Sequence, residues 1–84
     1  MTAWIRSPEA LARLAQSLAG CQAFALDTES DSLFHHHEKV CLVQIATEDG
    51  GCFLVDTLVL RDLSPLAPVM ADATVLKVLH GADY

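Results

Sequence analysis

With 84 residues, the chain has room for one small domain at most, and a hydrophobic content of 52% excludes a disordered chain. The formal net charge is −6 and the five Lys and Arg residues are scattered along the sequence, which argues against nonspecific nucleic-acid binding through a basic patch. A nucleic-acid enzyme that works through bound cations is not excluded, because those cations supply positive charge.

The first predicted element is a helix over residues 7–20. Ser7 is suited to the N-cap, Pro8 to the first helical position and Gly20 to the C-terminal stop. Apolar residues recur at helical spacing between these ends, at Leu11, Leu14, Ala15 and Leu18.

Three strands are predicted next, over residues 23–28, 39–47 and 52–57. The Glu-Asp-Gly-Gly turn at residues 48–51 makes the second and third strands an antiparallel hairpin. Cys41 and Cys52 fall in these apolar runs and Cys21 precedes them. Their odd number and lack of CxxC spacing predict buried free thiols.

A short helix is predicted from Ser64 as N-cap to about Met70, followed by a fourth strand over residues 74–80. The helical crossover allows the fourth strand to lie parallel to the first. The predicted fold is therefore α/β: a mixed sheet with a three-strand antiparallel meander, a helical crossover and a fourth strand parallel to the first.

Two carboxylates, Asp27 and Glu29, end the first predicted strand. Side chains two residues apart on a strand share a face, so the pair should project together with Cα atoms about 6.5–7 Å apart. Such a pair repels unless a cation neutralises it, and Mg²⁺ prefers carboxylate ligands. Because acidic residues are also common where strands meet solvent, Asp-x-Glu alone is a weak sign of a metal site.

The ordered segments FALDTESDSLFHHHEKVCLVQIAT, LVDTL, LSPLAPVMAD and VLKVLHGADY resemble the N-terminal half of a ribonuclease D-like 3′–5′ exonuclease domain, over residues 23–84. This family belongs to the DEDD superfamily and has a ribonuclease H-like fold. The resemblance implies that Asp27 and Glu29 of the DTE motif are catalytic metal ligands. It also implies two Mg²⁺ or Mn²⁺ ions in the complete site, and hydrolysis of RNA or DNA from the 3′ end that releases nucleoside 5′-monophosphates.

The family's second motif starts with a His and has its metal-binding Asp five residues later. HGADY supplies His80 but ends at Tyr84, and Asp83 stands two residues too early to take the ligand role. We therefore expect residues 1–84 to form the N-terminal part of one exonuclease domain. On its own this chain should be inactive. Its predicted helices can cover one face of the sheet and leave the other bare, so we expect the chain to be marginally stable, prone to aggregation or oligomeric.

Other candidate residues carry less information. His35, His36 and His37 cannot all face one way on a strand, so a polar loop is favoured over a metal site. A structural hydrogen bond is the favoured role for His80, with substrate-side roles for Thr28 and His80 as the alternative. We expect a turn hydrogen bond from Asp56. Gln44, Trp4 and Phe34 are expected to be structural, although the two aromatic residues could stack on bases.

Three functions remain open from the sequence. The leading one is the first half of a 3′–5′ exonuclease, with RNA the first substrate to consider and DNA open. The second is a noncatalytic remnant that binds a protein or a nucleic acid. The third is another ribonuclease H-like phosphodiesterase. No apolar run is long enough to span a bilayer and no signal peptide is recognisable, so we expect a cytoplasmic protein with no membrane partner.

Overall fold

The computed structural model describes residues 2–30 and 40–80. Along the chain the elements are β1 (Thr2–Ile5), α1 (Pro8–Ala19), β2 (Ala23–Ser30), β3 (Val40–Thr47), β4 (Cys52–Asp56), a 3₁₀ turn (Ser64–Leu66), α2 (Ala67–Ala71) and β5 (Leu76–His80). Within the described residues, no helix is long and apolar enough to cross a membrane.

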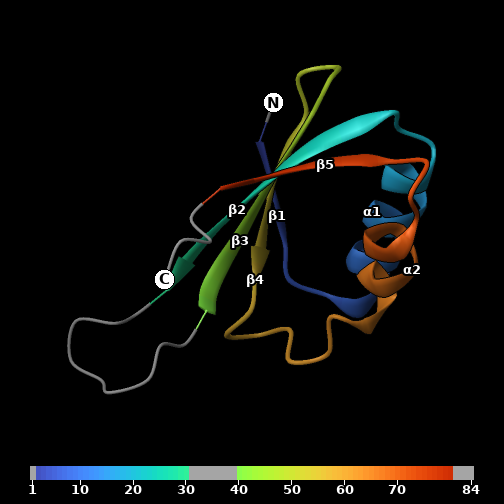
Figure 1. The fold of residues 1–84 in the computed structure, drawn as a ribbon. Helices are drawn as coiled ribbons and strands as arrows, with labels where there is room; N and C mark the ends of the chain where they lie inside the picture. Colours follow the sequence, from blue (N-terminus) through green and yellow to red (C-terminus); the bar gives the residue numbers. More distant parts are fainter. Residues whose placement is uncertain (1, 31–39, 81–84) are drawn as a thin grey trace.

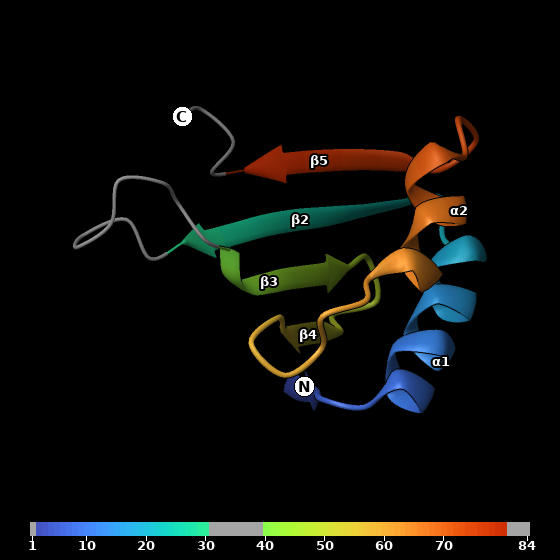
Figure 2. The ribbon, with the colours of Figure 1, turned by 90° about the horizontal axis from the view of Figure 1, so that it is seen from below.

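The five strands form one mixed sheet in the order β1-β4-β3-β2-β5. β2, β3 and β4 make the predicted antiparallel meander, and β5 returns through α2 to lie parallel to β2. β3 runs antiparallel to the other four strands, so the carboxyl ends of β1, β2, β4 and β5 meet at one edge of the sheet. The arrowheads of β2 and β5 point the same way, away from the helices (Figure 2).

One face of the sheet carries the hydrophobic core. Both helices lie on the same side of the sheet (Figure 1). Phe24, Ile45 and Val55 point to this side and are almost fully buried against Leu11 and Leu18 of α1. The leucines at helical spacing in α1 and the alternate apolar residues of the strands thus pack into a single core.

The predicted start of α1 is confirmed. The Ser7 hydroxyl accepts a hydrogen bond from the Ala10 N–H at 3.1 Å, Pro8 occupies the first turn, and Gly20 is the C-cap. Together these contacts satisfy backbone groups that a helix end leaves unpaired.

Three expectations were wrong in detail. β1 was not predicted, although it pairs in parallel with β4. Ser64 is not an N-cap: it opens the 3₁₀ turn without a side-chain cap, and its N–H donates to the Asp62 carboxylate at 3.0 Å. Cys21 and Cys52 are free thiols, but they are half-buried rather than buried: Cys21 lies in the connection between α1 and β2, and Cys52 is the first residue of β4.

Candidate metal site

β2 places Asp27 and Glu29 on one face of the sheet. Asp27 is in register with Gln44 of β3, and Glu29 is in register with Leu42 two residues away. A register shift follows directly after Glu29, between Glu29 and Ser30, and ends the regular pairing there. The predicted projection of the two carboxylates from one strand end is therefore confirmed.

The two carboxylates lie on the face opposite to the helices. Thr28, between them, is in register with buried Val43 and therefore points to the helix-covered face. The structure places Thr28 on the face opposite to the two carboxylates, and its contact with substrate stays a prediction.

Neither carboxylate is neutralised by a cationic side chain within the described part of the chain. Asp27 is half-buried and Glu29 is exposed. The salt bridge found among residues 2–30 and 40–80 joins Arg6 to Asp56 instead. Two adjacent carboxylates without a counter-charge favour the binding of a cation that prefers oxygen ligands, such as Mg²⁺.

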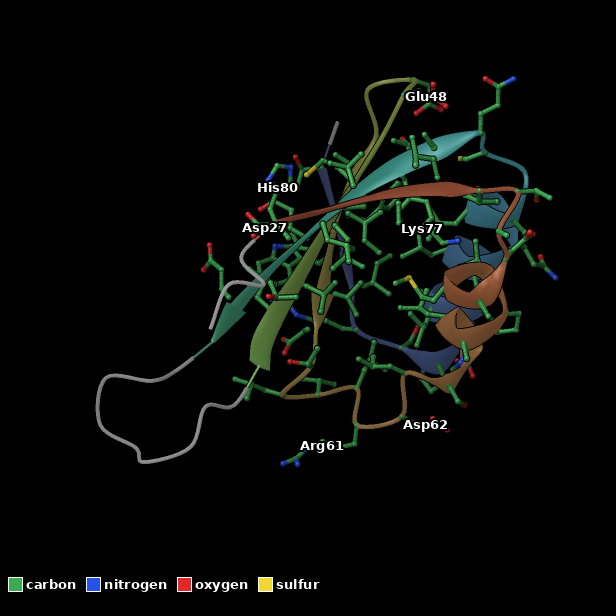
Figure 3. All side chains as sticks on the ribbon, viewed as in Figure 1. Asp27, Glu48, Arg61, Asp62, Lys77 and His80 are labelled. Carbon is green, nitrogen blue, oxygen red and sulfur yellow. The ribbon has the colours of Figure 1, made fainter. Side chains whose placement is uncertain are left out.

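Asp27 has Gln44 on one side and His80 on the other. His80 is exposed and in register with Asp27, and the two side chains lie next to one another at the end of the sheet remote from the helices (Figure 3). The Gln44 amide donates to the Cys52 sulfur at 3.5 Å. The residues that the structure describes contain no group of three or more His, Cys, Asp or Glu side chains arranged to hold a metal. They supply a pair of carboxylates with polar neighbours, not a closed metal cage.

Asp56 lies on the same face at the end of β4, but it is occupied by other contacts. Its Oδ1 accepts the N–H groups of Leu58 at 3.1 Å and Val59 at 3.3 Å, and its Oδ2 accepts Arg6 Nε at 3.3 Å. The expected turn hydrogen bond is therefore confirmed, and Asp56 is a structural carboxylate.

Three aspartates elsewhere have lowered pKa values. The hydroxyl of Thr47 and the N–H of Gly51 lower the pKa of Asp49, and contacts to Ser64 and Thr74 lower the pKa values of Asp62 and Asp72. Each of these carboxylates caps a turn. The cause is local hydrogen bonding, so these shifts do not mark an active site.

Sequence reasoning missed the geometric link between Trp4 and the site. Trp4 is in register with Leu54, Leu54 with Gln44, and Gln44 with Asp27. All four therefore lie on the face of the sheet opposite to the helices, called the uncovered face below. Only the pairing of β1 with β4 shows this, and no local signal in the sequence reports it. His35, His36, His37, Phe34 and Asp83 lie outside the described residues, as does the side chain of Cys41.

Comparison with known proteins agrees with this geometry. A family model described as 3′-5′ exonuclease matches residues 2–84. The chain belongs to the 3′–5′ exonuclease family. The family match extends over β1 and α1, beyond the segments on which the resemblance rests in the sequence.

Three relatives show how much of the exonuclease fold the chain represents. It is 44% identical over 81 residues to Protein RRP6-like 3 from Arabidopsis thaliana, spanning 95% of this chain and 9% of that protein. The catalytic core of RRP6 from Trypanosoma brucei has a TM-score of 0.89 at 30% identity, over 98% of this chain and 23% of that one. Escherichia coli RNase D, described as an exoribonuclease involved in structured RNA processing, has a TM-score of 0.85 at 30% identity, over 96% and 21%. The chain therefore spans less than a quarter of each relative.

Proposed function

We propose that this chain forms the amino-terminal part of a 3′–5′ exoribonuclease site, in which Asp27 and Glu29 are metal ligands. The observation that carries the proposal is the placement of both carboxylates on one uncovered face, at the carboxyl edge of the sheet, without a cationic partner among the described residues. Ligands of open α/β sheets bind at this edge.

The donor set fits Mg²⁺ or Mn²⁺. Carboxylate oxygens suit both ions, and Mg²⁺ is normally held by one or two carboxylates together with waters and substrate phosphates. When bound, such ions stabilise the attacking and leaving oxygens of phosphodiester hydrolysis. The contribution of this chain is to hold Asp27 and Glu29 at a fixed spacing on a paired strand.

RNA is the substrate class that the relatives favour. Escherichia coli RNase D is described as an exoribonuclease, and its match covers 96% of the present chain. With a net charge of −6, the chain would repel an RNA phosphate at the carboxylate pair unless a divalent cation were bound there. Metal binding and substrate binding should therefore be coupled at this site.

A chimaera tests the activity directly. Residues 2–84 replace the matching fifth of Escherichia coli RNase D, and hydrolysis of 5′-labelled single-stranded RNA is followed with Mg²⁺ or Mn²⁺. We expect shortening from the 3′ end and release of nucleoside 5′-monophosphates. Asp27→Asn should lower the rate by more than the roughly 10- to 100-fold that loss of an outer-shell partner costs.

Glu9→Gln is the matched control for the chimaera, since it removes one exposed carboxylate from α1, on the other side of the sheet. Its rate should equal that of the parent chimaera. A folded Asp27→Asn chimaera that keeps full activity would contradict the proposal.

The separate 84-residue chain should not hydrolyse RNA, because its described residues bring together only two of the carboxylates that the site needs. Purified chain is incubated with labelled RNA under single-turnover conditions. Cleavage that disappears in Asp27→Ala would show that this expectation is wrong.

A further inference from the structure

One row of side chains crosses the uncovered face of the sheet. It runs from Trp4 on β1 through Leu54 on β4 and Gln44 on β3 to Asp27 on β2 and His80 on β5. Neighbouring strands are about 4.8 Å apart, so Trp4 lies about 14 Å from Asp27 along this row. A single-stranded polynucleotide with its end at Asp27 could reach Trp4 within a few nucleotides.

Arg6 is held against the Trp4 ring. The guanidinium carbon lies 4.1 Å from the ring centroid, and Nε donates to Asp56 Oδ2 at 3.3 Å. Asp56 is fixed in turn by the N–H groups of Leu58 and Val59. A ring on one side and an anchored carboxylate on the other therefore orient the guanidinium plane.

The outer groups of this pair remain accessible. The side chain of Arg6 is 55% exposed and Trp4 is 49% exposed. Among the described residues, the hydrogen bond from Arg6 to Asp56 uses Nε and does not engage the two terminal amino groups. Planar guanidinium donors of this kind match phosphate oxygens, and an exposed indole offers a stacking surface to any base.

A second arginine, on the helix-covered side, approaches Trp4 at the edge of the sheet. Arg13 of α1 and Trp4 line one hollow of about 310 Å³, with apolar walls that include Ile5 and Phe53. An aromatic ring, an apolar recess and two guanidinium groups are the combination that single-stranded nucleic-acid sites use.

The distribution of positive charge favours a polyanion at this edge. Of the three arginines of the chain, Arg6 stacks on the Trp4 ring and Arg13 lines a hollow together with Trp4 and Ile5 of β1. Lys77, by contrast, donates from Nζ to the Asp72 carbonyl oxygen. In a chain of net charge −6, the described part of the molecule is therefore most attractive to phosphate near β1.

We propose that Trp4, Arg6 and Arg13 form a second contact for single-stranded RNA, which holds a nucleotide upstream of the 3′ end. The base stacks on the Trp4–Arg6 pair, and a phosphate accepts hydrogen bonds from the terminal amino groups of Arg6. This inference rests on the proposed function, because it assumes that the 3′ end of the same strand reaches Asp27 and Glu29. The alternative is that Trp4 serves only to pack against another segment of protein.

Trp4 is the only tryptophan of the chain, so its fluorescence reports this surface directly. The 84-residue chain, checked for sheet content by circular dichroism, is titrated with single-stranded oligoadenylate in EDTA at low salt. We expect saturable quenching that weakens as salt is added. Binding of a labelled oligonucleotide, followed by anisotropy, extends the measurement to variants without the indole.

Matched variants distinguish a specific contact with RNA from nonspecific attraction between positive charge and phosphate. Trp4→Leu should weaken RNA binding roughly fivefold to a hundredfold, the range expected for one base stack. Arg6→Gln should weaken it severalfold, and Arg6→Lys should recover only part of the loss because a lysine cannot stack or form a planar pair. Arg61→Gln removes the same charge from an exposed arginine that does not line the Trp4 hollow, and should have little effect.

Equal losses for Arg6→Gln and Arg61→Gln, or no quenching of Trp4 by RNA, would overturn the inference in favour of packing alone. Glu9→Gln, which removes an exposed carboxylate from α1, should leave this binding unchanged, and the binding is measured in EDTA without the cation that hydrolysis needs. A failure here can therefore be told from a failure of the proposed function, which the RNase D chimaera tests through hydrolysis.

Discussion

Carboxylates on the uncovered face differ in how the protein uses them. Asp56 accepts three hydrogen bonds that join β4, the following turn and Arg6. Asp27 and Glu29 have no cationic partner among the described residues, although they lie on one strand face. The first arrangement stabilises the fold, and the second costs repulsion that a bound cation would remove.

This difference predicts opposite effects of the same chemical change. In EDTA, Asp27→Asn should raise the free energy of unfolding by about 0.5–1 kcal/mol, because it relieves repulsion between two nearby charges. Asp56→Asn should lower the free energy of unfolding by about 1 kcal/mol, because it weakens charge-assisted hydrogen bonds. Chemical denaturation of the two variants checks both signs. A loss of stability in Asp27→Asn as large as that in Asp56→Asn would argue for a structural role of Asp27.

Lowered aspartate pKa values predict how stability changes with pH. Hydrogen bonds lower the pKa values of Asp49, Asp62 and Asp72 in the folded chain, so the stabilisation is present above the ordinary aspartate pKa. It should be lost as the pH falls below about 4. Denaturation midpoints between pH 7 and the acid range measure this, and Asp72→Asn should flatten the curve. A pH profile in Asp72→Asn identical to the parent would show that this turn does not contribute.

At the scale of elements, the sequence predicted what local patterns determine. The leucine spacing of α1 and the β-branched run of β3 identify their elements directly, and the Glu-Asp-Gly-Gly turn identifies the hairpin. Gly50 in that turn has a φ of +91°, a conformation that glycine adopts without strain. The projection of Asp27 and Glu29 to one face followed from alternation along a single strand.

Non-local pairing explains what the sequence did not predict. β1 has four residues and pairs with β4, about fifty residues away. Neither its length nor its composition distinguishes it from the start of a loop. The positions of Trp4, Gln44 and His80 relative to Asp27 depend on the registers of four strand pairs, so no single segment reveals them.

β5 is an edge strand that leaves apolar side chains exposed. Leu76 is 63% exposed and Val78 is 45% exposed, both on the uncovered face. An exposed apolar edge strand offers a template for pairing with another chain. We expect the isolated chain to self-associate, and Leu76→Lys with Val78→Lys to reduce this in analytical ultracentrifugation. Met70→Lys, on α2, is the matched control. A monomer with a sharp cooperative melt would contradict this expectation.

At the scale of the whole molecule, the sheet separates two tasks. Its helix-covered face holds the core, while its other face carries the carboxylate pair at one strand and the Trp4–Arg6 pair three strands away. The chain spans 9% to 23% of the relatives described above. Within the described residues, the part of the chain that bears on the proposed site is thus the pair of carboxylates, Asp27 and Glu29, and the sheet that positions them.

The central claim is that Asp27 and Glu29 bind a divalent cation, and paramagnetic broadening by Mn²⁺ tests it most directly. Substoichiometric Mn²⁺ is added to the ¹⁵N-labelled chain, since this method detects weak binding to an incomplete site. Amide signals of residues 26–29, with Gln44 and His80, should broaden first, and Asp27→Asn should abolish the effect while Glu9→Gln preserves it. Broadening spread evenly over the acidic residues, or unchanged in Asp27→Asn, would contradict the account.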